Sequence, residues 1–170
     1  MYKLYFKEVN DMKDIALPRN VLNHVNSHKI EAKKNESGLG YSLLCEGLKD
    51  FNVYDFDVDF TAKPTLIGCD LFFSISHDNG MALVAISDSN IGVDLMNIRD
   101  ISKKLIERIL NINEKVPTSP DEATLLWCKK EAAYKYDNTI YSLKDIDTTK
   151  YIYDVNKKDG YIIVVCYGKI

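Results

Sequence analysis

The spacing of apolar positions divides the chain into segments typical of strands and helices. Apolar and polar residues alternate over 2–9 and 51–60, which predicts a strand in each range. From about 18 to 48, apolar residues recur at three- and four-residue steps, which predicts helix. Turn residues separate three further apolar runs, so these runs predict short strands joined by tight hairpins. The three runs cover 71–76, 81–87 and 91–96.

The remaining chain predicts two helices followed by two strands. The first helix covers about 101–111. The second has a clear start signal at 119–122, where Ser, Pro, Asp and Glu supply an N-cap, a first-turn proline and an acid three residues after the cap. This helix should end near Tyr136. Strands at about 150–154 and 161–167 close the chain.

The order of these elements predicts an α+β protein. Strand, helices and strands occur twice in succession, so residues 1–90 and 91–170 have similar element order without a repeated sequence. No linker or low-complexity segment separates them. We therefore expect two small α+β lobes that pack as one body.

Composition excludes several classes of protein. Of the 170 residues 46% are apolar and 28% are charged, which is too hydrophobic for a disordered chain. Because 22 basic residues face 25 acidic ones, no overall positive field favours nucleic acid. There is neither a Walker-type nor a G-x-G-x-x-G loop. An anion therefore has to be bound by a local cluster of lysines.

The cysteines and the hydropathy indicate a soluble protein of the cytoplasm. The four cysteines lie far apart, with no C-x-x-C pair and no zinc-type spacing, so we expect buried, reduced thiols. The amino terminus has no signal-type apolar run, and no run is long enough to span a bilayer. We expect no membrane partner.

Three clusters hold residues that can carry chemistry, and each also has a purely structural explanation. Ser76 and His77 end a buried strand, where binding groups are often held, but His77 can also cap the local turn. Asp94 lies on the face of its strand opposite the apolar residues. A carboxylate there is costly to bury, so it has to bind a metal or form a salt bridge to Arg99 or a lysine. Gly92 beside it leaves room for a ligand or a close backbone.

The third cluster lies on the helix that starts at Ser119. Trp127, Glu131 and Lys135 follow one another at four-residue steps, and Trp127 is the only tryptophan of the chain. The structural explanation is an i,i+4 pair between Glu131 and Lys135 at the surface, with Trp127 in the core.

Taken together, these clusters resemble the signature blocks of the larger, pseudo-dimeric 4′-phosphopantetheinyl transferases, in the family's order and spacing over about 60–136. The family shows a Lys-Pro pair, F-N/S-x-S-H, G-[IV]-D-[IL]-E, F-[ST]-x-x-E and W-[ST]-x-K-E-[SA]-x-x-K. The corresponding segments here are Lys63-Pro64, Phe73–His77, Gly92–Met96, Leu110–Glu114 and Trp127–Lys135.

The resemblance implies a fold and a reaction. The fold is two similar α+β lobes about a pseudo-twofold axis, with the ligand site in the cleft between them. The reaction is Mg²⁺-dependent transfer of 4′-phosphopantetheine from coenzyme A to a serine of an acyl or peptidyl carrier protein by a monomeric enzyme. Asp94 and Glu131 are then the ligands of Mg²⁺, Glu131 also serves as base, and Lys130 and Lys135 contact the diphosphate.

The remaining implied roles belong to the nucleotide end of coenzyme A. Ser76 and His77 hold the 3′-phosphate, and Lys63 lies near the adenosine. The chain departs from the family pattern at Met96, where a second acid is usual, and lacks the glycine expected after Lys135. Two alternatives stay open: a degenerate member that binds coenzyme A or a carrier protein without turnover, and a non-enzymatic interaction module.

Overall fold

The computed structural model describes residues 1–8, 16–137, 139–140 and 142–170, and it is a mixed α+β structure. It consists of two compact units, Met1–Asn90 and Ile91–Ile170. Residue 9, the last of the first predicted strand, lies outside the described residues. None of the helices in the described ranges is long and apolar enough to cross a membrane.

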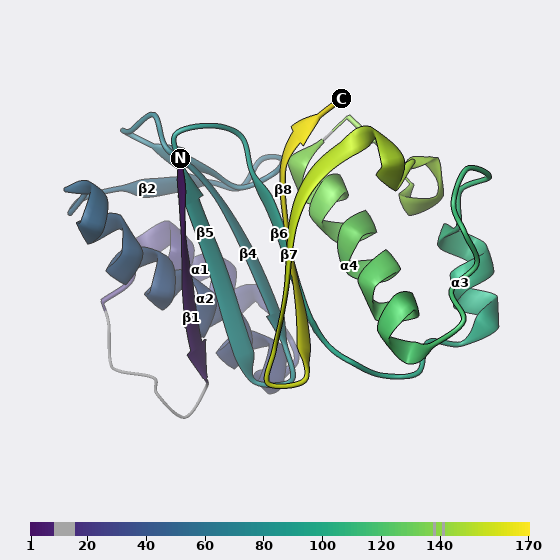
Figure 1. Ribbon diagram of the computed structural model, residues 1–170. Helices are drawn as coiled ribbons and strands as arrows, with labels where there is room; N and C mark the ends of the chain where they lie inside the picture. Colours follow the sequence, from purple (N-terminus) through teal and green to yellow (C-terminus); the bar gives the residue numbers. More distant parts are fainter. Residues whose placement is uncertain (9–15, 138, 141) are drawn as a thin grey trace. The chain divides into compact units, whose positions relative to one another are not determined.

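The first unit is an antiparallel sheet with helices on one face (Figure 1). The sheet has the order β1-β5-β4, α2 packs against all three strands, and α1 packs against α2. A small ribbon of β2 and β3 completes the unit. Its elements are β1 (Tyr2–Glu8), α1 (Arg19–Ser27), α2 (Glu31–Leu48), the 3-10 turn η2 (Lys49–Phe51), β2 (Asp57–Asp59), β3 (Thr65–Ile67), β4 (Phe72–Asp78) and β5 (Met81–Ser87).

The second unit is also an antiparallel sheet with a long helix against it (Figure 1). The sheet has the order β6-β8-β7, α4 packs against β6 and β8, and α3 contacts α4. Its elements are β6 (Gly92–Asn97), α3 (Lys103–Ile109), α4 (Pro120–Tyr136), the 3-10 turns η3 (Leu143–Asp145) and η4 (Thr148–Lys150), β7 (Tyr151–Lys158) and β8 (Tyr161–Lys169).

The two units repeat one strand order. In each unit the first strand pairs with the last strand, and the last strand pairs with the one before it, always antiparallel. The helices between them include one long helix, α2 or α4, that packs against the sheet. The units therefore share a topology although their sequences show no repeat.

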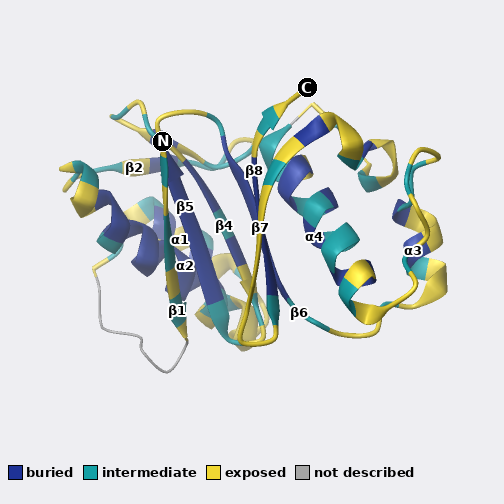
Figure 2. Ribbon diagram, in the orientation of Figure 1, coloured by how far each residue is buried: buried dark blue, intermediate teal, exposed yellow. Residues whose placement is uncertain are grey.

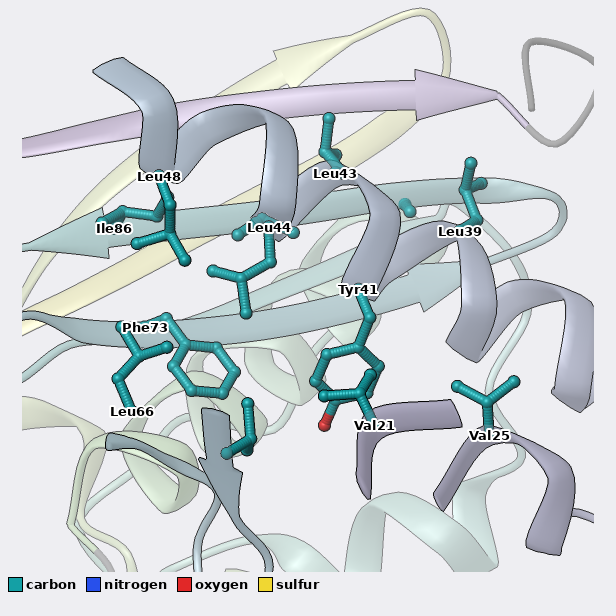
Figure 3. Packing of buried hydrophobic residues seen from close by; sticks show 13 residues of the cluster. Val21, Val25, Leu39, Tyr41, Leu43, Leu44, Leu48, Leu66, Phe73 and Ile86 are labelled. Atoms are coloured by element: carbon teal, nitrogen blue, oxygen red, sulfur yellow. The ribbon is translucent and has the colours of Figure 1, made fainter. Parts of the chain in front are cut away.

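Close packing of α2 on its sheet explains the glycines that interrupt its helical pattern. Leu44 and Leu48 of α2 meet Phe73 and Ile86 in the core of the first unit (Figure 3). A Cβ on Gly47 lies 2.8 Å from Cδ1 of Ile86. Such glycines weaken a helix intrinsically, but here they let it approach β4 and β5. Figure 2 shows that β5 is buried along almost its whole length.

Several elements were predicted correctly from the local sequence. The loop of the β4–β5 hairpin is Asn79-Gly80, and both residues have positive φ, as a type I′ turn requires. The predicted start of α4 is also confirmed, because the Ser119 hydroxyl accepts a hydrogen bond from the amide of Glu122 at 3.2 Å. The Glu122 carboxylate in turn accepts from the amide of Thr118 at 2.7 Å.

Other predictions were wrong. Over 51–60 only Asp57–Asp59 form a strand, and the apolar alternation comes from loop side chains such as Phe56 and Phe60, which pack on the core. The segment 18–48, however, is helical as predicted, and it forms the two helices α1 and α2. No hairpin joins β5 to β6, since β5 pairs with β1 and β4 whereas β6 pairs with β8. The expectation of free thiols is confirmed for all four cysteines, but only three of them are buried and Cys69 is partly exposed.

Candidate metal and phosphate site

β6 and α4 approach each other closely at Gly92. A Cβ on Gly92 would lie 2.1 Å from the carbonyl oxygen of Ala132 and 2.5 Å from the amide nitrogen of Tyr136. Only glycine fits there without displacing the helix. Of the two explanations that the sequence left open for Gly92, the structure shows the close backbone. This contact sets the carboxyl-terminal half of α4 against β6.

Asp94 lies two residues after Gly92 on β6, on the same face of the strand. Its partner is a lysine of α4. The ammonium of Lys135 donates to Oδ1 of Asp94 at 2.8 Å and to the carbonyl oxygen of Val93 at 2.9 Å. The Asp94 side chain is only 9% exposed, so a charged partner offsets the cost of burying its carboxylate. The predicted salt bridge to a lysine is therefore present.

Glu131 lies one helical turn before Lys135 on α4. Burial raises the pKa of Glu131, the negative charge of Asp94 raises it further, and the ammonium of Lys135 opposes both effects. Within the described ranges, the side-chain carboxylate of Glu131 has neither a hydrogen bond nor an ion pair. The surface pair expected between Glu131 and Lys135 is absent, because Lys135 binds Asp94 instead.

The donor set of this cluster suits a hard divalent cation. Two carboxylates that disfavour each other's charge are stabilised by a dication, and carboxylate oxygen is a ligand that Mg²⁺ prefers. The described residues contain no group of three or more histidine, cysteine, aspartate or glutamate side chains arranged to hold a metal. Asp94 and Glu131 would therefore supply two ligands, and water or substrate oxygens the others, as is usual for Mg²⁺.

Two other residues of the signature blocks belong to the core around α4. Met96 follows Asp94 on the same face of β6, is 7% exposed, and packs in a cluster with Cys128 and Ala132. Its side chain makes apolar contacts at this position. Trp127 packs partly buried against this cluster and against a second one that contains Ile106, so the core interpretation of Trp127 is confirmed.

Lys130 does not fit the phosphate contact that the resemblance implied. Its side chain is fully buried, and its ammonium lies 2.7 Å from Oε2 of Glu114 and donates to the carbonyl of Ile146. Burial lowers the pKa of Lys130, while Glu114 acts in the opposite direction. Because its ammonium is enclosed in this pair, Lys130 has a structural role in the second unit.

Glu114 organises the loops that cover Lys130. Its carboxylate accepts a hydrogen bond from the amide of Asn111 at 2.8 Å and from the amide of Thr148 at 2.8 Å. The side chain is 3% exposed, so Lys130 neutralises a carboxylate that would otherwise be buried unpaired. No role was predicted for Glu114 from the sequence, because nothing in the helical pattern shows that Lys130 is buried and needs a partner.

The three nucleotide-site residues predicted from the sequence lie in the first unit. The Nδ1 atom of His77, on β4, lies 3.1 Å from Oε2 of Glu36, on α2. Ser76 is buried on the same strand. Lys63 donates to the side-chain oxygen of Asn90 at 2.9 Å. The acidic neighbour of His77 has no signal in the sequence, because the two residues meet only through the packing of α2 on the sheet.

A separate pocket of about 330 Å³ lies between α3 and the start of α4. Its lining includes Ile101, Ile106, Val116 and Ala123. Ala123 precedes Glu131 by two helical turns, about 12 Å along the axis. The pocket is therefore no part of the cluster of Asp94, Glu131 and Lys135.

No protein-family model matches the chain, and no curated protein matches it. What the chain does therefore has to be inferred from its own residues.

Proposed function

We propose that this protein is a 4′-phosphopantetheinyl transferase of the larger, two-lobed type. It would transfer 4′-phosphopantetheine from coenzyme A to a serine of an acyl or peptidyl carrier protein. The observation that carries the proposal is the contact of Lys135 with Asp94 beside Glu131, because these residues come from two separate signature blocks. The strand order shared by the two units supports a pseudo-dimeric fold.

The cluster has the charges that diphosphate binding needs. Asp94 and Glu131 would hold Mg²⁺, which when bound neutralises charge on the diphosphate and on the leaving group. Lys135 is 26% exposed, so its ammonium can contact phosphate oxygens while it stays beside Asp94. Because the chain is acidic overall, attraction for coenzyme A has to come from such local cations.

Glu131 is the group best placed to act as base. The serine oxygen of the carrier protein forms a bond to the phosphorus that bears the pantetheine arm, and the bond from that phosphorus to the bridging oxygen breaks. The products are the phosphopantetheinyl serine and 3′,5′-ADP. The serine proton passes to the Glu131 carboxylate, directly or through a water molecule. Glu131 has no competing hydrogen bond within the described ranges.

The other roles keep their assignments with one exception. Ser76 and His77 would contact the 3′-phosphate of coenzyme A and Lys63 the adenosine end. Lys130 is removed from the set of phosphate ligands because it is enclosed with Glu114. Four free thiols suit a reducing compartment, so we place the reaction in the cytoplasm.

The transfer is tested by incubating the purified full chain with Mg²⁺, coenzyme A and several apo carrier proteins. A carrier protein that gains about 340 Da, the mass of the transferred group, supports the proposal. Mass spectrometry of the carrier protein, with and without a chelator of Mg²⁺, gives this result directly. The proposal fails if none of the carrier proteins gains this mass.

One observation favours a second candidate, a protein that binds coenzyme A without transferring its arm. Met96 packs in the core where the family usually has a carboxylate, so Mg²⁺ would have one protein ligand fewer. Calorimetric titration distinguishes the two candidates. Tight, Mg²⁺-dependent binding of coenzyme A without any mass gain on carrier proteins identifies the second.

A further inference from the structure

Two of the three histidines of the chain lie together at the end of α1. His24 is in the last turn of the helix, and His28 is the residue that ends it. Their ring centroids are 5.4 Å apart, and the ring planes are nearly perpendicular. Both residues are partly exposed to solvent.

The surroundings hold this pair in place. Val21 and Val25 seat α1 on the core of the first unit, next to Tyr41 (Figure 3). The ring of His24 stacks on Phe60, with centroids 4.1 Å apart and an interplanar angle of 11°. Stacking occupies the face of an imidazole and leaves the nitrogens at its edge available. The orientation of His24 is thus fixed before any ligand binds, which lowers the entropic cost of binding.

Neither imidazole is occupied by another polar group of the described chain. The side chains of His24 and His28 make ring contacts, and their imidazoles have no hydrogen bond or ion pair among the described residues. Neither imidazole therefore gives up a hydrogen bond or an ion pair to the described chain when it binds a metal ion.

The separation of the rings matches shared coordination of one ion. With a metal–nitrogen distance of about 2.0–2.1 Å, an imidazole centroid lies about 3.2 Å from the metal. Two imidazoles at a tetrahedral angle of about 109° then have centroids about 5.2 Å apart. The observed 5.4 Å is close to this value. The pair also lies at the carboxyl-terminal end of a helix, whose partial negative charge favours a cation.

We propose that His24 and His28 form a binding site for a divalent transition-metal ion of the Zn²⁺ class. Imidazole is a preferred ligand of Zn²⁺, Ni²⁺ and Cu²⁺ but not of Mg²⁺ or Ca²⁺. The described residues add no third histidine, cysteine or carboxylate to the pair, so water molecules complete the coordination. This site is independent of the cluster of Asp94, Glu131 and Lys135, both in its residues and in the metal that it selects.

The site is tested by titrating Zn²⁺ alone into the full chain, with binding followed by calorimetry. We expect His24→Ala and His28→Ala each to weaken Zn²⁺ binding at least about tenfold. His77→Ala and Cys69→Ser are matched controls, because they remove the third histidine and the one cysteine that is not buried. Both controls should bind Zn²⁺ like the parent chain, and Mg²⁺ in excess should not displace it.

A second readout does not depend on folding of the variants. In NMR spectra of the unmodified chain, Zn²⁺ should shift the imidazole signals of two histidines and leave those of His77 unchanged. If an alanine variant lowers the melting temperature, His28→Asn provides a milder way to remove one imidazole of the pair. Unchanged Zn²⁺ affinity in the His24 and His28 variants, or loss of binding in Cys69→Ser, overturns the proposal.

Discussion

Lys135 donates its ammonium to Asp94 at 2.8 Å across the contact between α4 and β6, although Glu131 lies one turn before it on its own helix. One carboxylate of the cluster is thereby neutralised, and the other keeps a charge that burial disfavours. Glu131 is therefore available to a cation or to a substrate proton.

Replacing Glu131 with glutamine should stabilise the metal-free protein. The pKa of Glu131 is raised in the folded protein. Its ionisation therefore destabilises the folded state at pH values above the ordinary pKa of a glutamate. Replacing the carboxylate with a neutral amide should therefore raise the melting temperature of the metal-free protein at pH 7. Mg²⁺ at about 100 times its dissociation constant should stabilise the parent chain by about 2.7 kcal/mol and should not stabilise the variant.

The control for this prediction is Glu107→Gln. Glu107 has Lys103 4.0 Å away in an exposed i,i+4 pair on α3, so it matches the helical spacing of Glu131 and Lys135 without their burial. Its replacement should leave both the melting temperature and the Mg²⁺ response almost unchanged. Equal Mg²⁺ responses in the parent chain and Glu131→Gln would rule Glu131 out as a ligand.

Gly92→Ala should destabilise the second unit. Its new Cβ would lie 2.1 Å from the Ala132 carbonyl, so α4 has to move away from β6 at a cost of about 3 kcal/mol or more. Gly38→Ala is the contrasting substitution. A Cβ on Gly38 meets only Val25, at 3.7 Å, within a helix, so alanine should stabilise by about 0.5–1 kcal/mol. Urea unfolding of both variants measures the two effects, and a neutral Gly92→Ala is incompatible with the close contact.

Lys130→Met should be strongly destabilising. It leaves the carboxylate of Glu114 buried without its cation, which costs about 3–5 kcal/mol. Adding Glu114→Gln removes that charge, so the double variant should be more stable than Lys130→Met alone. A double-mutant cycle of unfolding free energies gives the coupling. If Lys130→Met costs less than about 1 kcal/mol, Lys130 is free for a ligand after all.

Stability should fall at acidic pH in a way that depends on Asp137. Its carboxylate accepts hydrogen bonds from Lys169 at 2.7 Å and from the hydroxyls of Thr139 and Tyr151, and its pKa falls from 3.8 to about 2. A carboxylate with a lowered pKa stabilises the folded state at pH values above its ordinary, unfolded-state pKa. This stabilisation is lost as the pH falls through the pKa of the folded state.

The parent chain should therefore exceed Asp137→Asn in stability by about 1 kcal/mol, allowing for solvent screening, at neutral pH. This difference should shrink between pH 4 and pH 2, as the carboxylate of Asp137 becomes protonated. Thermal unfolding of both proteins across this range measures the difference. A difference that stays constant down to pH 2 contradicts the assignment.

Much of the local structure could be predicted because its causes are local. The cap at Ser119 and the proline after it define where α4 begins, and Asn79-Gly80 specifies a two-residue hairpin. Turn residues do not reveal which strands pair, however. Asp88–Asn90 resemble a hairpin loop, yet the strands on either side belong to different sheets.

The candidate site was predictable in its residues and only partly in its contacts. The signature blocks indicate Asp94, Glu131 and Lys135, and the close approach at Gly92 explains how β6 and α4 bring them together. Lys130 and Glu131 are neighbours in sequence, so they lie about 100° apart around the helix. Whether Lys130 faces a ligand or the core depends on the loop that carries Glu114, and helical spacing contains no information about that loop.

The most direct test of the proposed function is the phosphopantetheinyl transfer assay applied to site variants. With Mg²⁺ and coenzyme A, the parent chain should add about 340 Da to an apo carrier protein. Lys129→Met is the matched control, because Lys129 lies on the same helix with its ammonium 5.4 Å from the centre of the Tyr153 ring, and it should transfer like the parent chain. Glu131→Gln should lose the transfer while remaining folded. Lys135→Met should also lose the transfer, and it is assayed below its melting temperature because it leaves the buried carboxylate of Asp94 without its cation. Transfer by Glu131→Gln at the parental rate, or no transfer by the parent chain to any carrier protein, contradicts the account.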